Sequence, residues 1–143
     1  MSLPPRFSVN VIVNDRNQIL LLQRAPHLKR APSKWGFSGG HIEPGEDPES
    51  CSLREMHEEI GTDVQVELLA HLGPVPDAVS GTLEVYLFHY HWSGGSVNLN
   101  DEHTDYAWVQ ASAYPGYDVM TGIDADLDYF GIWPLKNSEE EKL

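Results

Sequence analysis

The chain has 143 residues, the length of one domain able to bury a hydrophobic core. Its formal net charge is −13. The negative charge argues against a nucleic-acid duplex as partner, because phosphate contacts need a basic surface. No apolar run approaches the roughly 20 residues of a membrane span. Cys51 is the only cysteine, which excludes an intrachain disulfide. Because no secretory signal is visible, we expect a cytoplasmic protein.

The first third of the chain predicts a β-hairpin followed by a basic loop. Residues 1–5 hold two prolines and predict an irregular start. Apolar residues that alternate along the chain predict strands over 7–13 and 18–23, joined by a turn rich in Asn and Asp. Basic residues then gather over 24–34. This patch suits either a small polyanion held beside carboxylates or an ordinary solvated loop; its members are Arg24, Lys29, Arg30 and Lys34.

The middle of the chain predicts an amphipathic helix. Asp47 is a suitable N-cap, and Pro48 suits the first helical position. The helix is predicted to run to about Ile60 and to end at Gly61, a residue typical of helix C-termini. Residues spaced by three and four positions form an apolar stripe expected to face a core: Leu53, Met56 and Ile60.

The same helix carries a ridge of three acids. Glu55, Glu58 and Glu59 stand at positions i, i+3 and i+4, a spacing at which like charges destabilise a helix by about 0.2–0.5 kcal/mol per pair. Such a ridge is either a solvated acidic face or a set of ligands for a cation. A hard divalent ion such as Mg²⁺ suits carboxylate oxygens best.

The remaining chain predicts more strands and a second helix. The strand over 82–92 alternates clearly, with Val85 and Leu87 on one face and Tyr86, Phe88 and Tyr90 on the other. Strands flanking one central helix indicate an α+β fold, and we expect one domain over residues 1–143. The other predicted elements are strands at 63–72 and 106–109, the second with Trp108 buried, breaks at 73–76 and 93–96, a short helix near 124–130, and a frayed tail at 136–143.

Two further patterns resemble metal-binding motifs but lack residues that those motifs need. Asp124, Asp126 and Asp128 resemble the start of an EF-hand loop, but Tyr129 replaces its glycine and no glutamate follows at position twelve. They are therefore expected to form a plain acidic loop. His89 and His91 share one strand face, but neither Cys nor His follows at a zinc-ligand spacing.

The acidic helix and the loop before it resemble the Nudix box, the motif G-x5-E-x7-R-E-U-x-E-E-x-G-U in which U is apolar. Residues 40–62 match it at every charged position, and a motif with so many fixed positions is specific. Thr62 departs from it where an aliphatic residue is usual, and Ser38 stands where family members often have proline. The matching residues are Gly40, Glu46, Arg54, Glu55, Met56, Glu58, Glu59 and Gly61.

This resemblance implies a Nudix fold, a mixed β-sheet between helices with the box at the mouth of the substrate cleft. It implies hydrolysis of a nucleoside diphosphate linked to a group X, with Mg²⁺ as cofactor and Mn²⁺ as a substitute. Arg54 and Glu46 would orient the other acids, and either Glu55 or Glu102 would take a proton from the attacking water. The implied metal ligands are the Gly39 carbonyl, Glu55, Glu58, Glu59 and Glu102, and the implied catalytic residues are Arg54, Glu55, Glu58 and Glu102.

Substrate identity is left open. The length favours the compact, MutT-like nucleoside-triphosphate pyrophosphohydrolases of the family, acting as a monomer or homodimer on a small nucleotide. An ADP-ribose or nucleotide-sugar pyrophosphatase is an alternative, and a non-catalytic nucleotide-sensing module is another. The residues expected to bind substrate are Arg24, Lys34, Trp35 and Phe37.

Overall fold

The computed structural model describes residues 4–133, which form a mixed β-sheet with helices packed on it. The elements in chain order are β1 (Arg6–Asn14), β2 (Ile19–Arg24), β3 (Trp35–Gly36), β4 (Ser38–His41), α1 (Pro48–Ile60), β5 (Val64–Pro76), β6 (Glu84–Gly95), β7 (His103–Val109), a 3₁₀ helix (Tyr114–Gly116) and α2 (Ile123–Tyr129).

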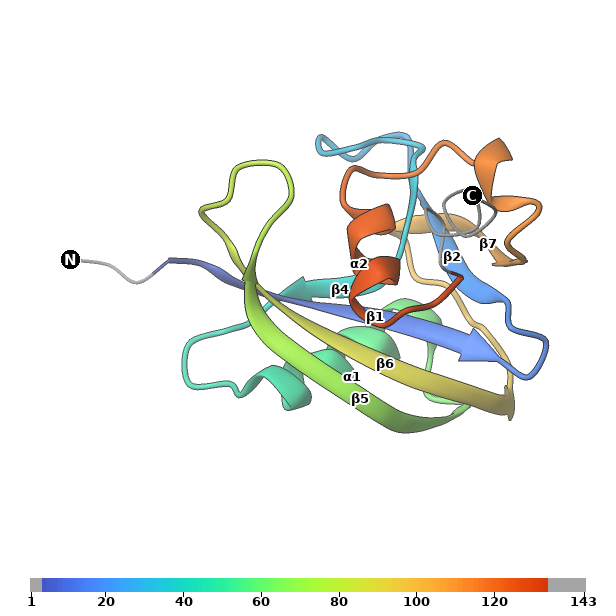
Figure 1. Ribbon diagram of the computed structural model, residues 1–143, viewed down its shortest axis with the longest axis horizontal. Helices are drawn as coiled ribbons and strands as arrows, with labels where there is room; N and C mark the ends of the chain where they lie inside the picture. Colours follow the sequence, from blue (N-terminus) through green and yellow to red (C-terminus); the bar gives the residue numbers. More distant parts are fainter. Residues whose placement is uncertain (1–3, 134–143) are drawn as a thin grey trace, which may run out of the picture.

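The sheet has the strand order β3-β2-β1-β6-β5, with β4 paired to β1 and β7 paired to β2 (Figure 1). β1 runs parallel to β6 along the whole length of β1, from Arg6 opposite Glu84 to Asn14 opposite Trp92. The other pairings are antiparallel. The predicted hairpin of β1 and β2 pairs only beside its turn, at Val13 and Ile19. Beyond that point the two strands separate. β1 then pairs with β4, and β2 pairs with β7.

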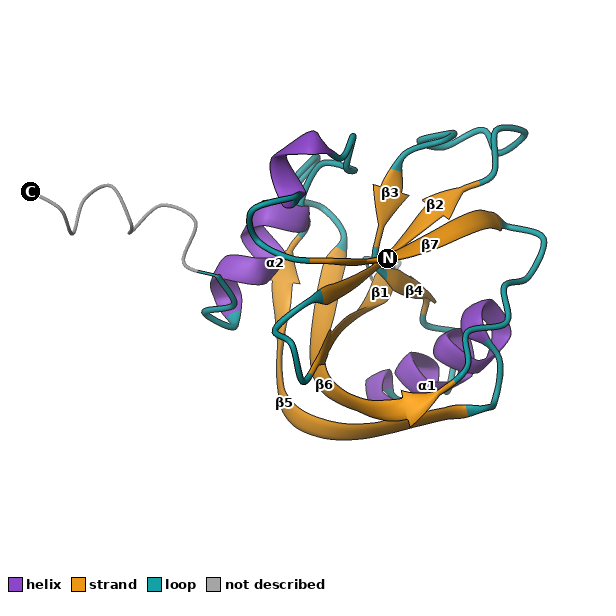
Figure 2. Ribbon diagram, turned by 90° about the vertical axis from the view of Figure 1, so that its right-hand side faces the viewer, coloured by secondary structure: helices purple, strands orange, loops and turns teal. Residues whose placement is uncertain are grey.

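Both faces of the sheet are buried, since α1 covers one face and α2 the other (Figure 2). Alternate residues of a strand point to opposite faces. Accordingly Leu20 and Leu22 pack on the α1 side with Met56, whereas Ile19 and Leu21 pack on the α2 side. The unbroken apolar run of β2 is explained by this arrangement, because a strand covered on both faces needs no polar side.

Helix α1 begins and ends as predicted. Its N-cap Asp47 accepts a hydrogen bond from the backbone N–H of Ser50 at 2.7 Å, and Gly61 ends it with φ 89°. The predicted apolar stripe is partly wrong, because Leu53 is exposed while Met56 is fully buried. Polar Ser52 takes the place expected for Leu53 in the buried face; its hydroxyl bonds to Asn10 and Tyr90 of the sheet.

Strands β5 and β6 are longer than predicted. The expected break at 73–76 is wrong, because β5 runs on to Pro76 with a register shift between Leu72 and Val75. Because β5 is an edge strand, its prolines remove no hydrogen bond from a neighbour. Likewise the turn expected at 93–96 is the end of β6, which pairs with β5 up to Gly95.

The C-terminal part contains the predicted short helix, α2 at Ile123–Tyr129. The aspartates of the EF-hand-like pattern belong to this helix, so the expectation of an acidic loop is wrong. Trp108 is only half-buried, and its ring meets that of Trp92 at 5.2 Å. The predicted tail 136–143 lies outside the described residues, as do residues 1–3 of the irregular start.

Candidate active site

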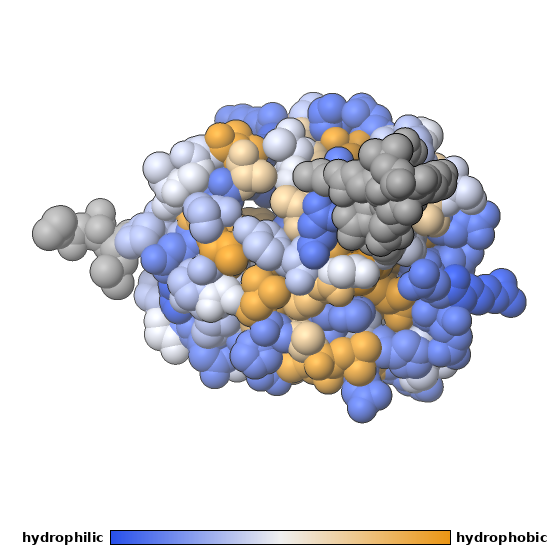
Figure 3. All heavy atoms as spheres, viewed as in Figure 1, coloured by the Kyte–Doolittle hydropathy of each residue, from blue (hydrophilic) through white to orange (hydrophobic). Residues whose placement is uncertain are grey.

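A cleft of about 790 Å³ opens between the sheet, the loop joining β5 to β6, and α2. Figure 3 shows its mouth as a hollow on the face that carries α2. Strand β4 contributes Gly39 to the lining, Phe37 lines the cleft from its position between β3 and β4, α1 contributes Glu59, and β7 contributes His103. The cleft therefore reaches from α2 to the end of the Nudix-like helix, and its volume is of the size that holds a small molecule.

Of the three ridge acids, Glu59 is the one that lines this cleft. It is 5% exposed, and its carboxylate accepts hydrogen bonds from the Gly39 backbone N–H, at 2.9 Å, and from Ser38. Burial raises the pKa of Glu59 to about 8 against these two bonds, and repulsion from Glu55 and Glu102 adds to the rise. Within residues 4–133 no Lys or Arg pairs with it. Its ionised form thus has no counter-charge in direct contact, and Arg24 acts on it only from a longer distance.

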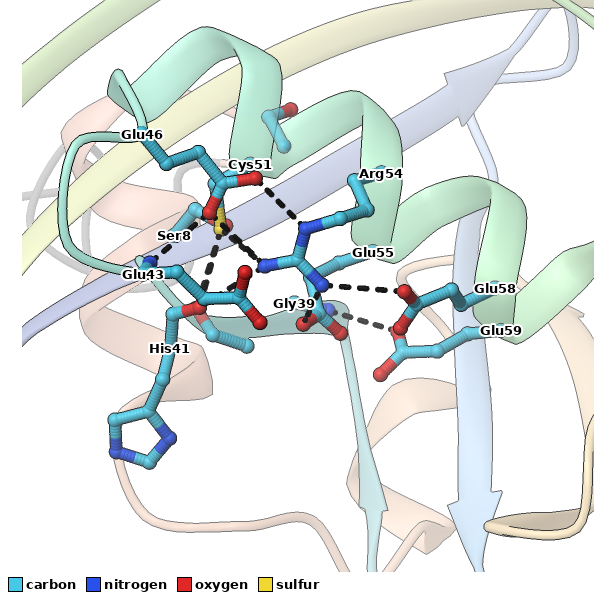
Figure 4. Close-up of polar contacts among 12 residues, drawn as sticks. Ser8, Gly39, His41, Glu43, Glu46, Cys51, Arg54, Glu55, Glu58 and Glu59 are labelled. Carbon is cyan, nitrogen blue, oxygen red and sulfur yellow. Dashed lines mark hydrogen bonds and ion pairs between the residues drawn. The ribbon is translucent and has the colours of Figure 1, made fainter.

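Arg54 gathers the other acids of the box between α1 and the end of β4, where it also donates to the His41 carbonyl (Figure 4). Its Nε and Nη2 donate to the two carboxylate oxygens of Glu46 at 2.7 and 3.0 Å. Its Nη1 donates to Glu55 at 3.0 Å and to Glu58 at 3.2 Å. The bonds to Glu46 hold the pKa of that carboxyl at about 2. The predicted acidic ridge is therefore not simply a solvated face: Arg54 binds Glu55 and Glu58, whereas Glu59 is buried in the cleft.

Replacing Arg54 with Lys is expected to lower kcat/KM by about 10- to 100-fold, the range typical of residues that orient ligands. Lysine keeps the charge but cannot form the two-pronged contact with Glu46 while reaching Glu55 and Glu58. The melting temperature should also fall, because three carboxylates then share a compact ammonium group. Arg16, in the exposed β1–β2 turn, gives a matched control: Arg16→Lys should change neither quantity. Unaltered kinetics in the Arg54 variant would contradict the positioning role.

The geometry fits a divalent cation. Glu59 offers a buried carboxylate that forms no direct ion pair with the described Lys and Arg side chains, and carboxylate oxygens are the donors that hard cations prefer. One oxygen each of Glu59 and Glu102 and one ring nitrogen of His103 lie within 4.8 Å of one another. Glu102 lies in the loop before β7, as expected. Glu55 and Glu58 are held by Arg54, and Glu58 is largely exposed.

The residues expected to bind substrate divide into two groups. Arg24, Lys34 and Phe37 line the cleft, and Arg30 of the basic patch joins them there. Trp35 does not line it; its ring packs against Tyr117, 5.1 Å away, in the core on the α2 side.

Three cleft residues have a place here that the sequence did not indicate. His103 directly follows Glu102, and this adjacency is the one signal that could have found it. Asp126 lines the cleft from α2, and burial raises its pKa to about 7. Tyr129, one turn further along, lines the same wall and is 46% exposed. Only the docking of α2 on the sheet brings Asp126 and Tyr129 to the cleft.

Neither α-helix within residues 4–133 has the length and apolar character needed to cross a bilayer. Residues 4–129 match the family described as NUDIX domain. The chain is 30% identical to the nucleoside triphosphatase NudI of Klebsiella pneumoniae, over 85% of this chain and 93% of that protein. It is 34% identical to the NAD-capped RNA hydrolase NudC of Stutzerimonas stutzeri, over 83% of this chain and 42% of that protein.

Among solved structures, the Ap4A hydrolase of C. elegans superposes with a TM-score of 0.71 at 22% identity, covering 89% of this chain and 95% of that one. This likeness bears out the α+β fold, with a mixed sheet and two helices. The expected family is confirmed by the match over residues 4–129, which includes the whole acidic box. The chain therefore belongs to the Nudix hydrolase family.

Proposed function

We propose that this chain is a metal-dependent pyrophosphohydrolase that cleaves a phosphoric anhydride bond of a nucleoside triphosphate. One observation carries the proposal: the buried carboxylate of Glu59, which forms no direct ion pair in the described chain, lines the same cleft as three basic side chains. A cation at Glu59 and the basic residues would together neutralise a polyphosphate. The nucleoside triphosphatase NudI matches this chain over most of its length, which supports a triphosphate as substrate.

Each part of the cleft has a separate task in this proposal. Arg24, Arg30 and Lys34 bind the phosphate chain. Glu59 and Glu102 hold the cation, with the Gly39 carbonyl, Glu55 and Glu58 as the further oxygen donors inferred from the box. When bound, the cation polarises a phosphoryl oxygen and lowers the pKa of the attacking water. The nucleoside lies toward Phe37 and Tyr129, whose rings lie along the cleft.

The reaction needs a base and a leaving group. A water oxygen forms a bond to the phosphorus next to the nucleoside, the bridging P–O bond breaks so that pyrophosphate leaves with the bridging oxygen, and one water proton passes to a carboxylate. Glu55 and Glu102 are the two carboxylates we propose for this role. Burial raises the pKa of Glu55 despite the ion pair with Arg54, a change that moves a carboxyl group toward the range useful for proton transfer at neutral pH.

The test is a substrate panel with phosphate and pyrophosphate measured separately. We expect turnover of NTPs or dNTPs with Mg²⁺ or Mn²⁺ and release of pyrophosphate, with weaker hydrolysis of ADP-ribose, nucleotide sugars and dinucleoside polyphosphates. Preference for one of these other compounds would move the assignment to that substrate. Tight nucleotide binding by calorimetry, without turnover of any compound under either metal, would contradict hydrolysis and favour a nucleotide-sensing module.

A further inference from the structure

A buried histidine stands beside the carboxylates assigned to the cation. His103 begins β7 and is 7% exposed. One of its ring nitrogens lies within 4.8 Å of a carboxylate oxygen of Glu59 and of Glu102. His103 lies more than forty residues after the end of the acidic box, so the motif itself does not include it. The three donors converge from α1, from the loop before β7 and from β7 itself.

The hydrogen bonds around His103 determine which nitrogen is available. Its Nδ1 lies 3.3 Å from Oδ1 of Asn100. The same Oδ1 accepts the backbone N–H of Glu102 at 3.2 Å, while Nδ2 of Asn100 donates to the Glu102 carboxylate at 3.4 Å. A backbone N–H can only donate, so the orientation of the Asn100 amide is fixed. A carbonyl oxygen can only accept, so Nδ1 carries the hydrogen.

It follows that the lone pair of the neutral ring is on Nε2. This is the arrangement found in metal-binding histidines, in which one nitrogen donates to an oxygen acceptor that orients the ring and the other binds the metal. Within residues 4–133 no hydrogen bond to Nε2 of His103 exists. The buried ring, which lies beside two carboxylates, thus has one nitrogen in use and one, Nε2, without a hydrogen-bond partner.

We propose that Nε2 of His103 is a ligand of the divalent cation held by Glu59 and Glu102, and that this nitrogen makes the site prefer Mn²⁺ to Mg²⁺. Mg²⁺ favours an octahedron of oxygen ligands and gives up its water reluctantly. Imidazole nitrogen binds more readily to ions of the transition-metal series. The inference rests on the metal dependence of the proposed function but not on which nucleotide is cleaved.

Pulsed EPR of the Mn²⁺-loaded protein tests the ligand directly. A coordinated imidazole should give nitrogen modulation of the Mn²⁺ signal in the wild-type protein, which requires no variant to fold. The modulation should disappear in His103→Gln and persist in His57→Gln, a control at an exposed position of α1. A bound Mn²⁺ without nitrogen modulation in the wild-type protein would overturn the proposal, as would modulation that survives in His103→Gln.

Calorimetric titrations test the selectivity. In His103→Gln the affinity for Mn²⁺ should fall by about 10-fold or more and the affinity for Mg²⁺ by less than about 3-fold, since loss of a single well-oriented partner costs 10- to 100-fold in metal binding. Equal losses for both ions would show that His103 only supports the loop, and would overturn the proposal. Nitrogen coordination of Mn²⁺ without hydrolysis of any nucleotide would support His103 as a ligand and contradict the proposed function.

Discussion

Replacing Glu59 with Gln is expected to reduce turnover by at least about 100-fold while leaving the fold intact. Orienting residues around a metal typically cost 10- to 100-fold when removed, and Glu59 is assigned here to the metal itself. Glutamine has nearly the same shape, and its amide oxygen can still accept the hydrogen bond from the Gly39 backbone N–H. The variant therefore changes the charge of the buried group and little else.

The same substitution should increase the stability of the metal-free protein at high pH. Burial raises the pKa of Glu59 to about 8, whereas an unfolded chain leaves glutamate near about 4.3. Between these values the folded state keeps a proton that the unfolded state has released, so the free energy of unfolding falls as the pH rises. The fall is at most about 1.4 kcal/mol per pH unit. The glutamine side chain of the variant has no proton to lose, so the variant lacks this decline.

Urea unfolding in EDTA at pH 6 and pH 8.5 measures the effect. Burial raises the pKa of the half-buried Asp126 to about 7 and also raises the pKa of Glu55. Both carboxyls add a decline of the same sign to both proteins, so the difference between the two proteins reports on Glu59. Glu67→Gln, at an exposed position of β5, should match the wild type in turnover and in pH dependence. A Glu59→Gln protein with normal turnover, or with the wild-type decline in stability, would remove Glu59 from the metal site.

Addition of Mg²⁺ or Mn²⁺ should reverse the order of stability. A cation that binds only the folded state stabilises it, by about 2.7 kcal/mol at a hundred times its dissociation constant. We expect this gain in the wild type at pH 8.5, where ionised Glu59 has a counter-charge once the metal is bound, and a much smaller gain in the Glu59→Gln variant. An equal gain in both proteins would place the metal elsewhere.

The local parts of the fold could be predicted because local rules determine them. The predicted bounds of the helix from Pro48 to Ile60 are confirmed, since a capping aspartate and a terminal glycine act on their own neighbours. The strand ends were less predictable. Gly73 and Pro74 interrupt a strand in most settings, and only the position of β5 at the sheet edge, which no local pattern reveals, lets the strand continue past them.

The site shows the same division between local and tertiary information. Spacing placed Glu55, Glu58 and Glu59 on one side of a helix, but it could not show that Glu59 is buried in the cleft while Glu58 is exposed. That difference arises from the way α1 packs on the sheet through Ser52 and Met56. His103 reaches the site from β7, and only the pairing of β7 with β2 brings it there.

Gly40→Ala and Gly39→Ala should fail in different ways, although they are neighbours in one strand. A Cβ atom at position 40 would collide with the carboxylate of Glu55, which is the end of a side chain and can move aside. We expect the variant to fold with a small loss of stability and to lose about 10- to 100-fold in turnover, because the Glu55 carboxylate can no longer keep the position that Arg54 gives it.

A Cβ atom at position 39 would instead meet backbone. It would collide with the carbonyl oxygen of Ser8 and approach Cα of Val9 to 3.1 Å, within the antiparallel pair of β1 and β4. The backbone of a paired strand cannot move aside, so we expect a loss of about 3 kcal/mol or more in the free energy of unfolding. Neither glycine has a positive φ, so crowding alone is responsible.

Gly116→Ala is the matched control for both variants, because a Cβ there meets no atom within 4 Å and its φ is also not positive. Urea titration and turnover per folded molecule separate the two kinds of failure. If Gly40→Ala kept full turnover, Glu55 would not need its position and could be neither base nor ligand. If Gly39→Ala kept wild-type stability, β4 could move away from β1, and the Gly39 N–H that binds Glu59 would not be fixed by the sheet.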